Sequence, residues 1–253
     1  MALTWEGVPT CNLCGGMGSK PFLRSDVPPW YAGQPINLVE CTDCGLVRAD
    51  PRPERTGLYQ NYLRGADNVR AIVQRKLARP NVTEQHRRAI EEARTFCDHP
   101  ATTLYDMGCG AGTVMMAARD LGLTAEGNDI NKAAVDMLRA KGFNARLGFT
   151  KDLRLTAKAY DIVMNLDYLE HSYEPLQDLE TCYRILRDGG VLYLKTLYLG
   201  SPGHVTDGER WKLFGNGHFH YFHPETLRAL VERAGFRVVQ FTLGNLVTVI
   251  ATR

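Results

Sequence analysis

The stretch Leu104-Tyr105-Asp106-Met107-Gly108-Cys109-Gly110-Ala111-Gly112 decides the fold of this chain. An apolar run ends in an acidic residue and continues into a turn with glycine at every second position, which is typical of a strand followed directly by a helix. Glycine has no Cβ, so the backbone of such a turn can pass close to a bound ligand. The sequence therefore predicts a ligand site at the carboxyl end of a strand over 102–107.

An acidic residue about one strand–helix unit downstream, Asp129, fits the same site. A carboxylate at that place can accept hydrogen bonds from the two hydroxyl groups of a ribose. The spacing of the turn separates two classes of adenosine cofactor. A dinucleotide fingerprint needs its third glycine at position 113, which is threonine, whereas the third glycine here is Gly112. This spacing favours an adenosyl ligand without phosphate.

Strand and helix signals alternate from residue 102 to the end of the chain. Strands are expected over 102–107, 123–128, 143–147, 160–166, 191–196, 236–242 and 246–252. Helices are expected over 112–121, between Asn131 and Gly142, from Pro175, and from Pro224 to Ala234. The pattern predicts an α/β fold with a Rossmann-like, seven-stranded, mostly parallel sheet and helices on both faces.

Two cysteine pairs precede this region, Cys11 with Cys14 and Cys41 with Cys44, and a glycine follows each pair. Each pair is typical of a tight turn that presents two thiolates. Four thiolates complete the tetrahedral coordination of Zn²⁺ and leave no open position, so we expect a structural zinc site. The remaining cysteines, which we expect to fill core space, are Cys97, Cys109 and Cys182.

The chain divides into three expected segments. They are a zinc-ribbon-like module over 1–50, a helical linker or lid over 51–100 with helices near 69–77 and 83–96, and a cofactor-binding domain over 101–253. With 30 Lys+Arg and 28 Asp+Glu the chain is close to neutral, which argues against a large nucleic-acid surface. No apolar run reaches the roughly 20 residues of a membrane span and no secretory leader is visible, so we expect a cytoplasmic protein without membrane contact.

Four segments together resemble the class I S-adenosylmethionine-dependent methyltransferases: 106–112, 127–130, 160–171 and 184–190. The cysteine pairs, the Pro51-Arg52-Pro53 stretch and the segment 218–227 resemble the subgroup with an N-terminal four-cysteine zinc module. Members of that subgroup often occur with sugar, polysaccharide or secondary-metabolite biosynthesis. The resemblance implies S-adenosyl-L-methionine as cofactor and a small-molecule acceptor.

The resemblance also implies which residues bind the cofactor. The matching positions are Asp106, Gly108, Gly110, Gly112, Asp129, Ile130, Asn165 and Leu166. The glycines would line the methionine and ribose portions, and Asp106 would orient the amino-acid portion. Asp129 would bind the ribose and Ile130 would pack on the adenine. Asn165 and Leu166 would face the sulfonium and the acceptor.

Methylation of a hydroxyl group needs a base, and His171 lies at the carboxyl end of the fourth expected strand. An imidazole titrates near neutral pH, so His171 is the leading candidate, with a helix-start histidine bonded to backbone as the alternative. His218 and His220 are further candidates, in an aromatic loop over 198–223. That loop is expected to form an acceptor wall, or else to bridge the sheet and the last helix.

The segment Asp167-Tyr168-Leu169-Glu170-His171 also resembles the Glu-x-x-Glu-His arrangement of ubiquinone-type O-methyltransferases that use a divalent cation. The resemblance implies a Mg²⁺ site at Asp167, Glu170 and His171, with an ordinary polar loop as the alternative.

Taken together, these features favour a methyltransferase that O-methylates a sugar-like or secondary-metabolite acceptor. One alternative is an RNA methyltransferase that uses the zinc module for docking, which predicts binding that weakens steeply with salt. Another is a non-catalytic protein that binds S-adenosylmethionine and acts through interaction with partners.

Overall fold

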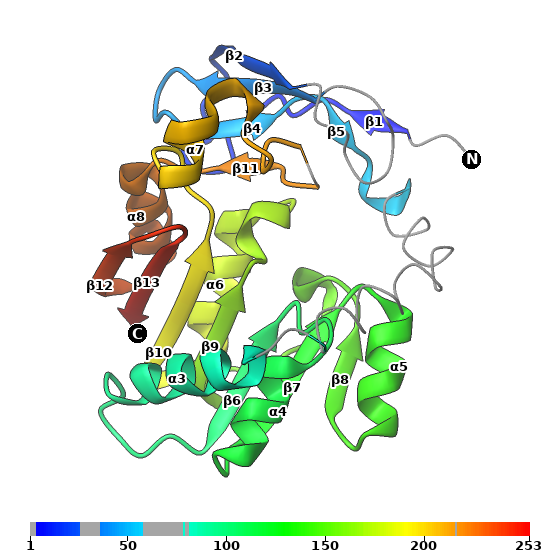
Figure 1. Ribbon diagram of the computed structural model, residues 1–253, viewed down its shortest axis with the longest axis vertical. Coiled ribbons are helices and arrows are strands. Elements are labelled where there is room, and N and C mark those ends of the chain that lie inside the picture. The colour runs from blue at the N-terminus through cyan, green and yellow to red at the C-terminus, as the bar shows by residue number, and fades with distance from the viewer. Residues whose placement is uncertain (1–3, 26–35, 58–77, 79–80, 216) are drawn as a thin grey trace.

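The computed structural model describes residues 4–25, 36–57, 78, 81–215 and 217–253. A large sheet with helices forms one part of the molecule, and a group of short strands is stacked on one end of it (Figure 1). The helix expected near 69–77 lies outside the described residues.

The large sheet has seven strands. In spatial order they are β12 (Arg237–Leu243), β13 (Val247–Thr252), β10 (Leu186–Thr196), β9 (Tyr160–Leu166), β6 (Thr103–Met107), β7 (Thr124–Asp129) and β8 (Asn144–Leu147). The strands from β10 to β8 run parallel, and β13 runs antiparallel to both of its neighbours. The predicted Rossmann-like sheet is therefore confirmed.

One expected strand boundary was wrong by several residues, whereas the other strand ends lie within one residue of the expected positions. The strand expected at 191–196 begins earlier, because β10 already pairs with β9 at Leu186. The register then shifts between Leu186 and Val191, and the Gly189-Gly190 pair lies inside this irregularity. Gly189 has φ of 76°, a conformation that glycine adopts without the steric cost of a Cβ.

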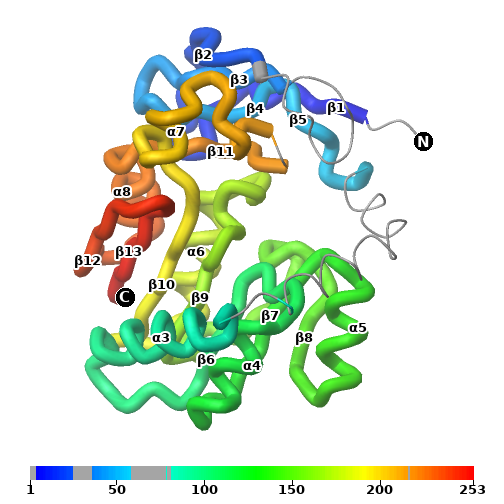
Figure 2. Tube along the Cα trace, in the orientation of Figure 1, coloured from blue at the N-terminus to red at the C-terminus, as the bar shows by residue number. Residues whose placement is uncertain are grey.

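Helices cover both faces of the sheet (Figure 2). One face carries α3 (Val82–Arg94), α4 (Thr113–Asp120) and α5 (Lys132–Ala140), and the other carries α6 (Pro175–Ile185) and α8 (Pro224–Arg233). Side chains alternate along β6: Leu104 packs with α3 and α4, whereas Tyr105 and Met107 pack with α6 and α8. This alternation produces two apolar cores, one on each side of the sheet.

The N-terminal strands form a second layer. β2 (Ser19–Ser25), β3 (Ile36–Cys41) and β4 (Val47–Ala49) form an antiparallel sheet, and β1 (Trp5–Glu6) pairs with β5 (Arg52–Pro53). The fourth strand of this sheet is β11 (His220–Tyr221), which pairs with β4 although it comes from the far end of the chain. Short α7 (Pro202–Asp207) belongs to the same long connection. The segment boundaries at 50 and 100 stay a prediction.

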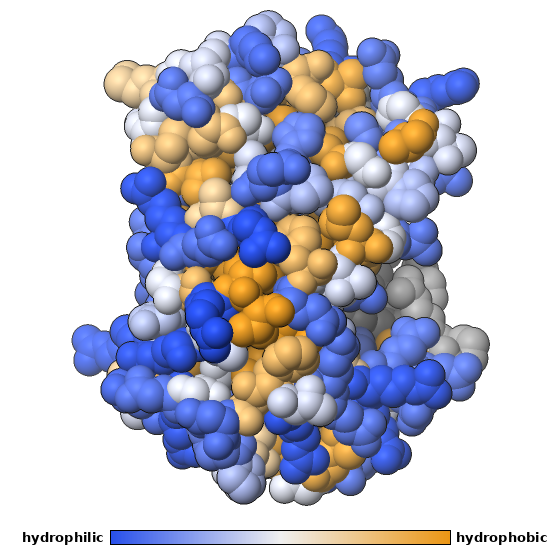
Figure 3. Space-filling view, turned by 90° about the vertical axis from the view of Figure 1, so that its left-hand side faces the viewer, coloured by the Kyte–Doolittle hydropathy of each residue, from blue (hydrophilic) through white to orange (hydrophobic). Residues whose placement is uncertain are grey.

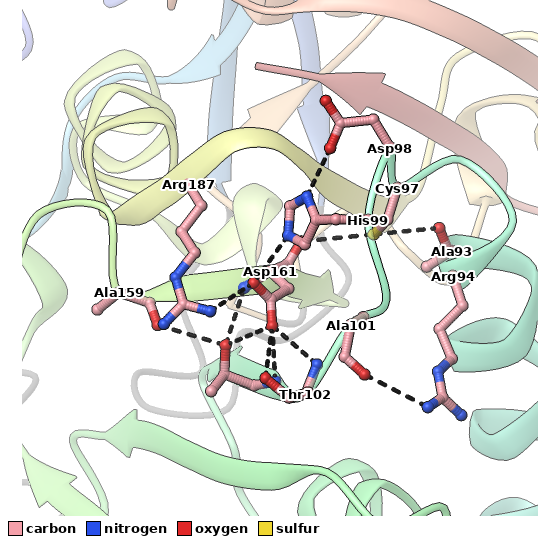
Figure 4. A network of polar contacts seen from close by, with 11 residues as sticks. Ala93, Arg94, Cys97, Asp98, His99, Ala101, Thr102, Ala159, Asp161 and Arg187 are labelled. Carbon is pink, nitrogen blue, oxygen red and sulfur yellow. Dashed lines mark hydrogen bonds and ion pairs between the residues drawn. The ribbon is translucent and has the colours of Figure 1, made fainter.

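A polar clamp joins the amino ends of β6 and β9, at the edge of the sheet away from the glycine turn (Figure 4). The carboxylate of Asp161 is fully buried. Its Oδ2 accepts the backbone N–H groups of Thr102 and Thr103 at 2.8 and 2.9 Å. Its Oδ1 accepts from Arg187 Nη1 at 2.7 Å and from His99 Nε2 at 3.0 Å. Burial raises the pKa of this carboxyl, but the hydrogen bonds outweigh burial and hold its pKa well below the usual range.

The face that carries β12 and β13 shows hydrophobic residues gathered along its centre, with hydrophilic residues on either side (Figure 3). Val238, Val239 and Phe241 of the edge strand β12 are partly buried against the two cores. Among the described residues, no helix has both the length and the apolar character of a membrane span.

Candidate functional site

The glycine turn lies between β6 and α4, as its sequence predicts. Gly108, Gly110 and Gly112 have φ of 69°, 46° and 74°, which only glycine adopts readily. A Cβ on Gly108 would stand 2.6 Å from Cδ2 of Tyr168, and one on Gly112 would stand 2.1 Å from Cδ2 of Leu138. Two of the three glycines are therefore required by packing as well as by backbone conformation.

Asp129 ends β7 beside this turn because β7 pairs in parallel with β6. Its Oδ2 accepts the N–H of Gly110 at 2.8 Å, and its Oδ1 accepts the N–H of Asn131 at 2.7 Å. Asn131 in turn caps α5, since its side chain accepts the N–H of Ala134. The carboxylate thus joins the glycine turn to the start of the next helix.

A pocket of about 300 Å³ opens at the carboxyl ends of these strands. Six of the residues proposed from the sequence line it: Gly108, Gly110, Asp129, Ile130, Asp167 and His171. The proposed residues that do not line it are Asp106, Gly112, Asn165, Leu166, Glu170, His218 and His220. Asp106 and Asn165 are buried within the sheet layer.

His171 ends the short 3-10 helix η2 (Leu169–His171), which follows β9. Its Nδ1–H donates to the carbonyl oxygen of Gly217 at 2.8 Å. This bond selects the tautomer in which Nε2 carries the lone pair, the state that a general base needs. The two alternatives considered for His171, a backbone-bonded histidine and a candidate base, therefore describe the same side chain. Its Nδ1 is bonded to backbone, and its ring lines the pocket.

The other two candidate histidines are buried. The ring of His218 lies 4.6 Å from that of His171, and its Nδ1–H donates to Leu213 O at 2.8 Å. Burial, and after it the neighbouring His171, lowers the pKa of His218 to about 3. His220 donates its Nε2–H to Asn12 Oδ1 at 3.0 Å, and burial followed by the charge of Arg52 lowers its pKa to about 3. Both rings are neutral at pH 7, and His171 is the histidine of the three that reaches the pocket.

The expected Mg²⁺ ligands do not come together as a set. Among the described residues, the group near η2 with ligand atoms within 4.8 Å of one another consists of Glu170, His171 and His218, without Asp167. The carboxyl group of Glu170 accepts from Thr196 Oγ1 at 2.7 Å inside the core. Burial, and after it the charge of Asp167, raises the pKa of Glu170 to about 8. Mg²⁺ at Asp167, Glu170 and His171 is therefore unsupported.

A hydrogen-bonded group that the sequence did not reveal lines the pocket. Asp178 of α6 accepts from Tyr168 Oη at 3.0 Å and from Ser172 Oγ at 2.5 Å, and all three line the pocket. Burial raises the pKa of Asp178 to about 6, although both hydrogen bonds oppose the rise. The position of Tyr168 just after β9 is a sequence signal for a pocket residue. Asp178 has no such signal, because a polar residue within an amphipathic helix such as α6 is ordinary.

The pocket lining also carries charged residues that the sequence did not single out. The guanidinium of Arg55 lies 4.0 Å from the ring centre of Phe149 and pairs with Asp152 at 3.3 Å. Lys151 forms an ion pair with Glu174 beside it. Arg55, Phe149, Lys151 and Glu174 all line the pocket, so its lining carries both signs of charge.

The four cysteines come together as expected. The Sγ atoms of Cys11 and Cys44 are 3.4 Å apart, those of Cys14 and Cys41 are 3.6 Å apart, and all four lie within 4.8 Å of one another. A tetrahedron with Zn–S bonds of about 2.3 Å has S–S edges of roughly 3.8 Å. Each cysteine pair forms a knuckle, a tight turn that presents two thiolates. In the first knuckle, the backbone N–H groups of Leu13 and Gly16 donate to the sulfurs of Cys11 and Cys14, each at 3.4 Å. The donor set therefore fits a closed four-thiolate site.

Comparisons with known proteins agree with this geometry. A family model described as a methyltransferase domain matches residues 71–241. A "Probable S-adenosylmethionine-dependent methyltransferase" of Mycolicibacterium smegmatis is 31% identical over 143 residues, which cover 55% of this chain and 53% of that protein. A ubiquinone biosynthesis O-methyltransferase of Cereibacter sphaeroides is 28% identical over 100 residues, 37% of this chain and 40% of that protein. The matches thus span about half or less of these relatives.

A solved structure supports the fold. It is the Burkholderia thailandensis 1,6-didemethyltoxoflavin-N1-methyltransferase with bound 1,6-didemethyltoxoflavin and S-adenosylhomocysteine. It superposes with a TM-score of 0.58 at 15% identity and covers 84% of this chain and 97% of that chain.

Proposed function

The chain belongs to the methyltransferase-domain family, and from this premise we propose that it methylates a hydroxyl group of a small, sugar-like or secondary-metabolite acceptor in the cytoplasm. It is an S-adenosylmethionine-dependent methyltransferase of class I. The observation that carries the choice of reaction is His171, a pocket-lining imidazole with its Nδ1–H bonded to a backbone carbonyl. That arrangement suits removal of a proton from an acceptor hydroxyl.

S-adenosylmethionine, when bound, supplies a methyl group on a positively charged sulfur. The glycine turn and Asp129 would hold its methionine and ribose portions, and Ile130 would pack on its adenine. Tyr168 closes this side of the pocket against Gly108. His171 would take the hydroxyl proton on Nε2 while the pocket aligns the acceptor oxygen, so that base and alignment both contribute to the rate.

The test is incubation of the full chain with methyl-labelled S-adenosylmethionine and pools of sugars, nucleotide sugars and phenolic metabolites. Mass spectrometry should detect an acceptor that gains one methyl group on oxygen. We expect His171→Ala to lower turnover at least 100-fold, since general-base catalysis contributes about 10²–10⁴-fold. The control is His223→Ala, because His223 makes no side-chain cap bond to α8. Near-normal turnover of His171→Ala would remove His171 as the base.

We further propose that the four cysteines hold a structural Zn²⁺, as in the zinc-module subgroup that the sequence resembles. The mutual distances of the thiolates support this, and they leave no ligand position for catalysis. Metal binding contributes on the order of 10 kcal/mol to small folds of this kind. We expect about one zinc per chain by elemental analysis, loss of that zinc in Cys41→Ser, and proteolytic sensitivity of residues 5–48 in this variant. Cys97→Ser serves as control, and unchanged zinc in Cys41→Ser would contradict the site.

A further inference from the structure

The first cysteine knuckle contacts a residue that lines the pocket. Asn12, between Cys11 and Cys14, donates its Nδ2–H to the carbonyl oxygen of Tyr173 at 3.2 Å. Arg52, which follows the second knuckle, donates Nη1–H to the same oxygen at 2.8 Å. Tyr173 lines the pocket two residues after His171. Two residues of the N-terminal layer thus donate to the backbone carbonyl of one pocket-lining residue.

The side chain of Tyr173 is fixed by the same layer. Its hydroxyl donates to the carbonyl oxygen of Pro53 at 2.8 Å, and the guanidinium of Arg52 lies 4.5 Å from its ring centre. The ring also packs against Phe219 at 4.9 Å and Phe149 at 6.2 Å. The backbone and the ring of this pocket-lining residue are therefore both held from outside the large sheet.

Asn12 has a second partner on the other side. Its Oδ1 accepts the Nε2–H of His220, the first residue of β11. β11 in turn pairs with β4, where His220 lies opposite Arg48. One amide side chain consequently joins the knuckle, the segment after η2 and the long connection after β10.

The second knuckle makes no equivalent contact among the described residues. Thr42 occupies the position between Cys41 and Cys44 that corresponds to Asn12. It is exposed, and its Oγ1 donates to the neighbouring Asp43 at 3.4 Å. The two knuckles share a sequence pattern but differ in what they face, so the contacts of Asn12 are not a general property of such turns.

We propose that Asn12 is a positioning residue which couples the four-cysteine site to the side of the pocket at Tyr173, so that metal in the cysteines orders Tyr173. The coupling rests on the proposed zinc and acceptor functions. Its physical basis is the knuckle backbone, in which Gly15 N–H donates to Cys11 O at 2.9 Å and Cys11 N–H donates to Gly16 O at 2.8 Å. A filled site fixes this turn and therefore the direction of the Asn12 amide.

Hydrogen–deuterium exchange on the purified full chain tests the coupling, with three variants that separate the two bonds of Asn12. Asn12→Ala removes both bonds. Asn12→Asp keeps an acceptor for His220 but cannot donate to Tyr173. Thr42→Ala is the matched control in the other knuckle.

The three variants should differ in the rate of deuterium exchange in two peptides. Asn12→Ala should speed exchange about two- to tenfold in both 172–176 and 218–222, as expected for loss of one hydrogen bond at each place. Asn12→Asp should speed exchange in 172–176 alone, and Thr42→Ala should leave both peptides at the wild-type rate. Zinc content and affinity for S-adenosylhomocysteine should stay unchanged in all three variants. Removal of zinc from the wild type by a chelator should speed exchange in 172–176.

Three results would overturn the proposal. The first is wild-type exchange in 172–176 for Asn12→Ala, and the second is equal effects of Asn12→Asp and Asn12→Ala on both peptides. The third is chelation that leaves 172–176 unchanged. Absence of zinc from the purified protein is a different outcome: it refutes the zinc assignment and the metal part of the coupling, while the variants still decide whether Asn12 positions Tyr173.

Discussion

Replacement of Asp129 by Asn should weaken cofactor binding without unfolding the protein. Each carboxylate oxygen of Asp129 accepts one loop N–H, from Gly110 at 2.8 Å and from Asn131 at 2.7 Å. Asparagine is nearly isosteric but keeps one acceptor oxygen and brings a donor to the other position. The variant therefore loses a charged hydrogen-bond acceptor. Both the N–H of the glycine turn and the proposed ribose hydroxyl donate to that acceptor in the wild type.

The magnitude follows from one lost hydrogen bond to an ionised group, about 1.5–3 kcal/mol, which raises the dissociation constant roughly 10- to 150-fold. The assay is calorimetric titration with S-adenosylhomocysteine, together with thermal unfolding. Asp136→Asn is the control, because Asp136 on the surface of α5 pairs only with Lys132 among the described residues. Asp129→Asn with the wild-type dissociation constant would refute the assignment of the ribose site.

Two further changes test the packing of the large sheet at its two ends. Asp161→Asn should cost about 1.5–3 kcal/mol at pH 7, because the buried carboxylate loses charge-assisted hydrogen bonds from Arg187 and from backbone N–H groups. The pKa of Asp161 is lowered in the folded protein. Its contribution to stability is therefore complete above the usual carboxyl pKa of about 3.9 and is lost as the pH falls below that value. The difference in the free energy of unfolding between the wild type and Asp161→Asn, measured in urea, should become smaller over the same pH range. Gly112→Ala should cost about 2–4 kcal/mol, since the new Cβ would meet Leu138 at 2.1 Å and φ is 74°. Wild-type urea midpoints for either variant would contradict these accounts.

Local signals in the sequence predicted most of the large sheet. β9 has the expected bounds, and Asn131 and Gly142 flank α5 as their side-chain chemistry predicts. Periodicity identifies such elements because it depends only on neighbours along the chain. β11 was missed for the opposite reason: it has two residues, and its partner β4 lies far away in the sequence.

The site residues that could be predicted are those that belong to a short local sequence pattern. The glycine turn, Asp129 and the cysteine pairs are local patterns, and the structure brings each set together. Asp178, Arg55 and Tyr173 reach the pocket from different elements, so no spacing in the sequence joins them. The buried positions of His218 and His220 likewise depend on tertiary packing, which the alternation of histidine and aromatic residues does not reveal.

The central claim is that the pocket beside the glycine turn accepts an adenosyl sulfonium without phosphate. Titration calorimetry of the full chain with S-adenosylhomocysteine, and separately with NAD⁺, tests it most directly. We predict saturable binding of one S-adenosylhomocysteine per chain and no heat of binding with NAD⁺. Saturable binding of NAD⁺ in the absence of any binding of S-adenosylhomocysteine would contradict the claim.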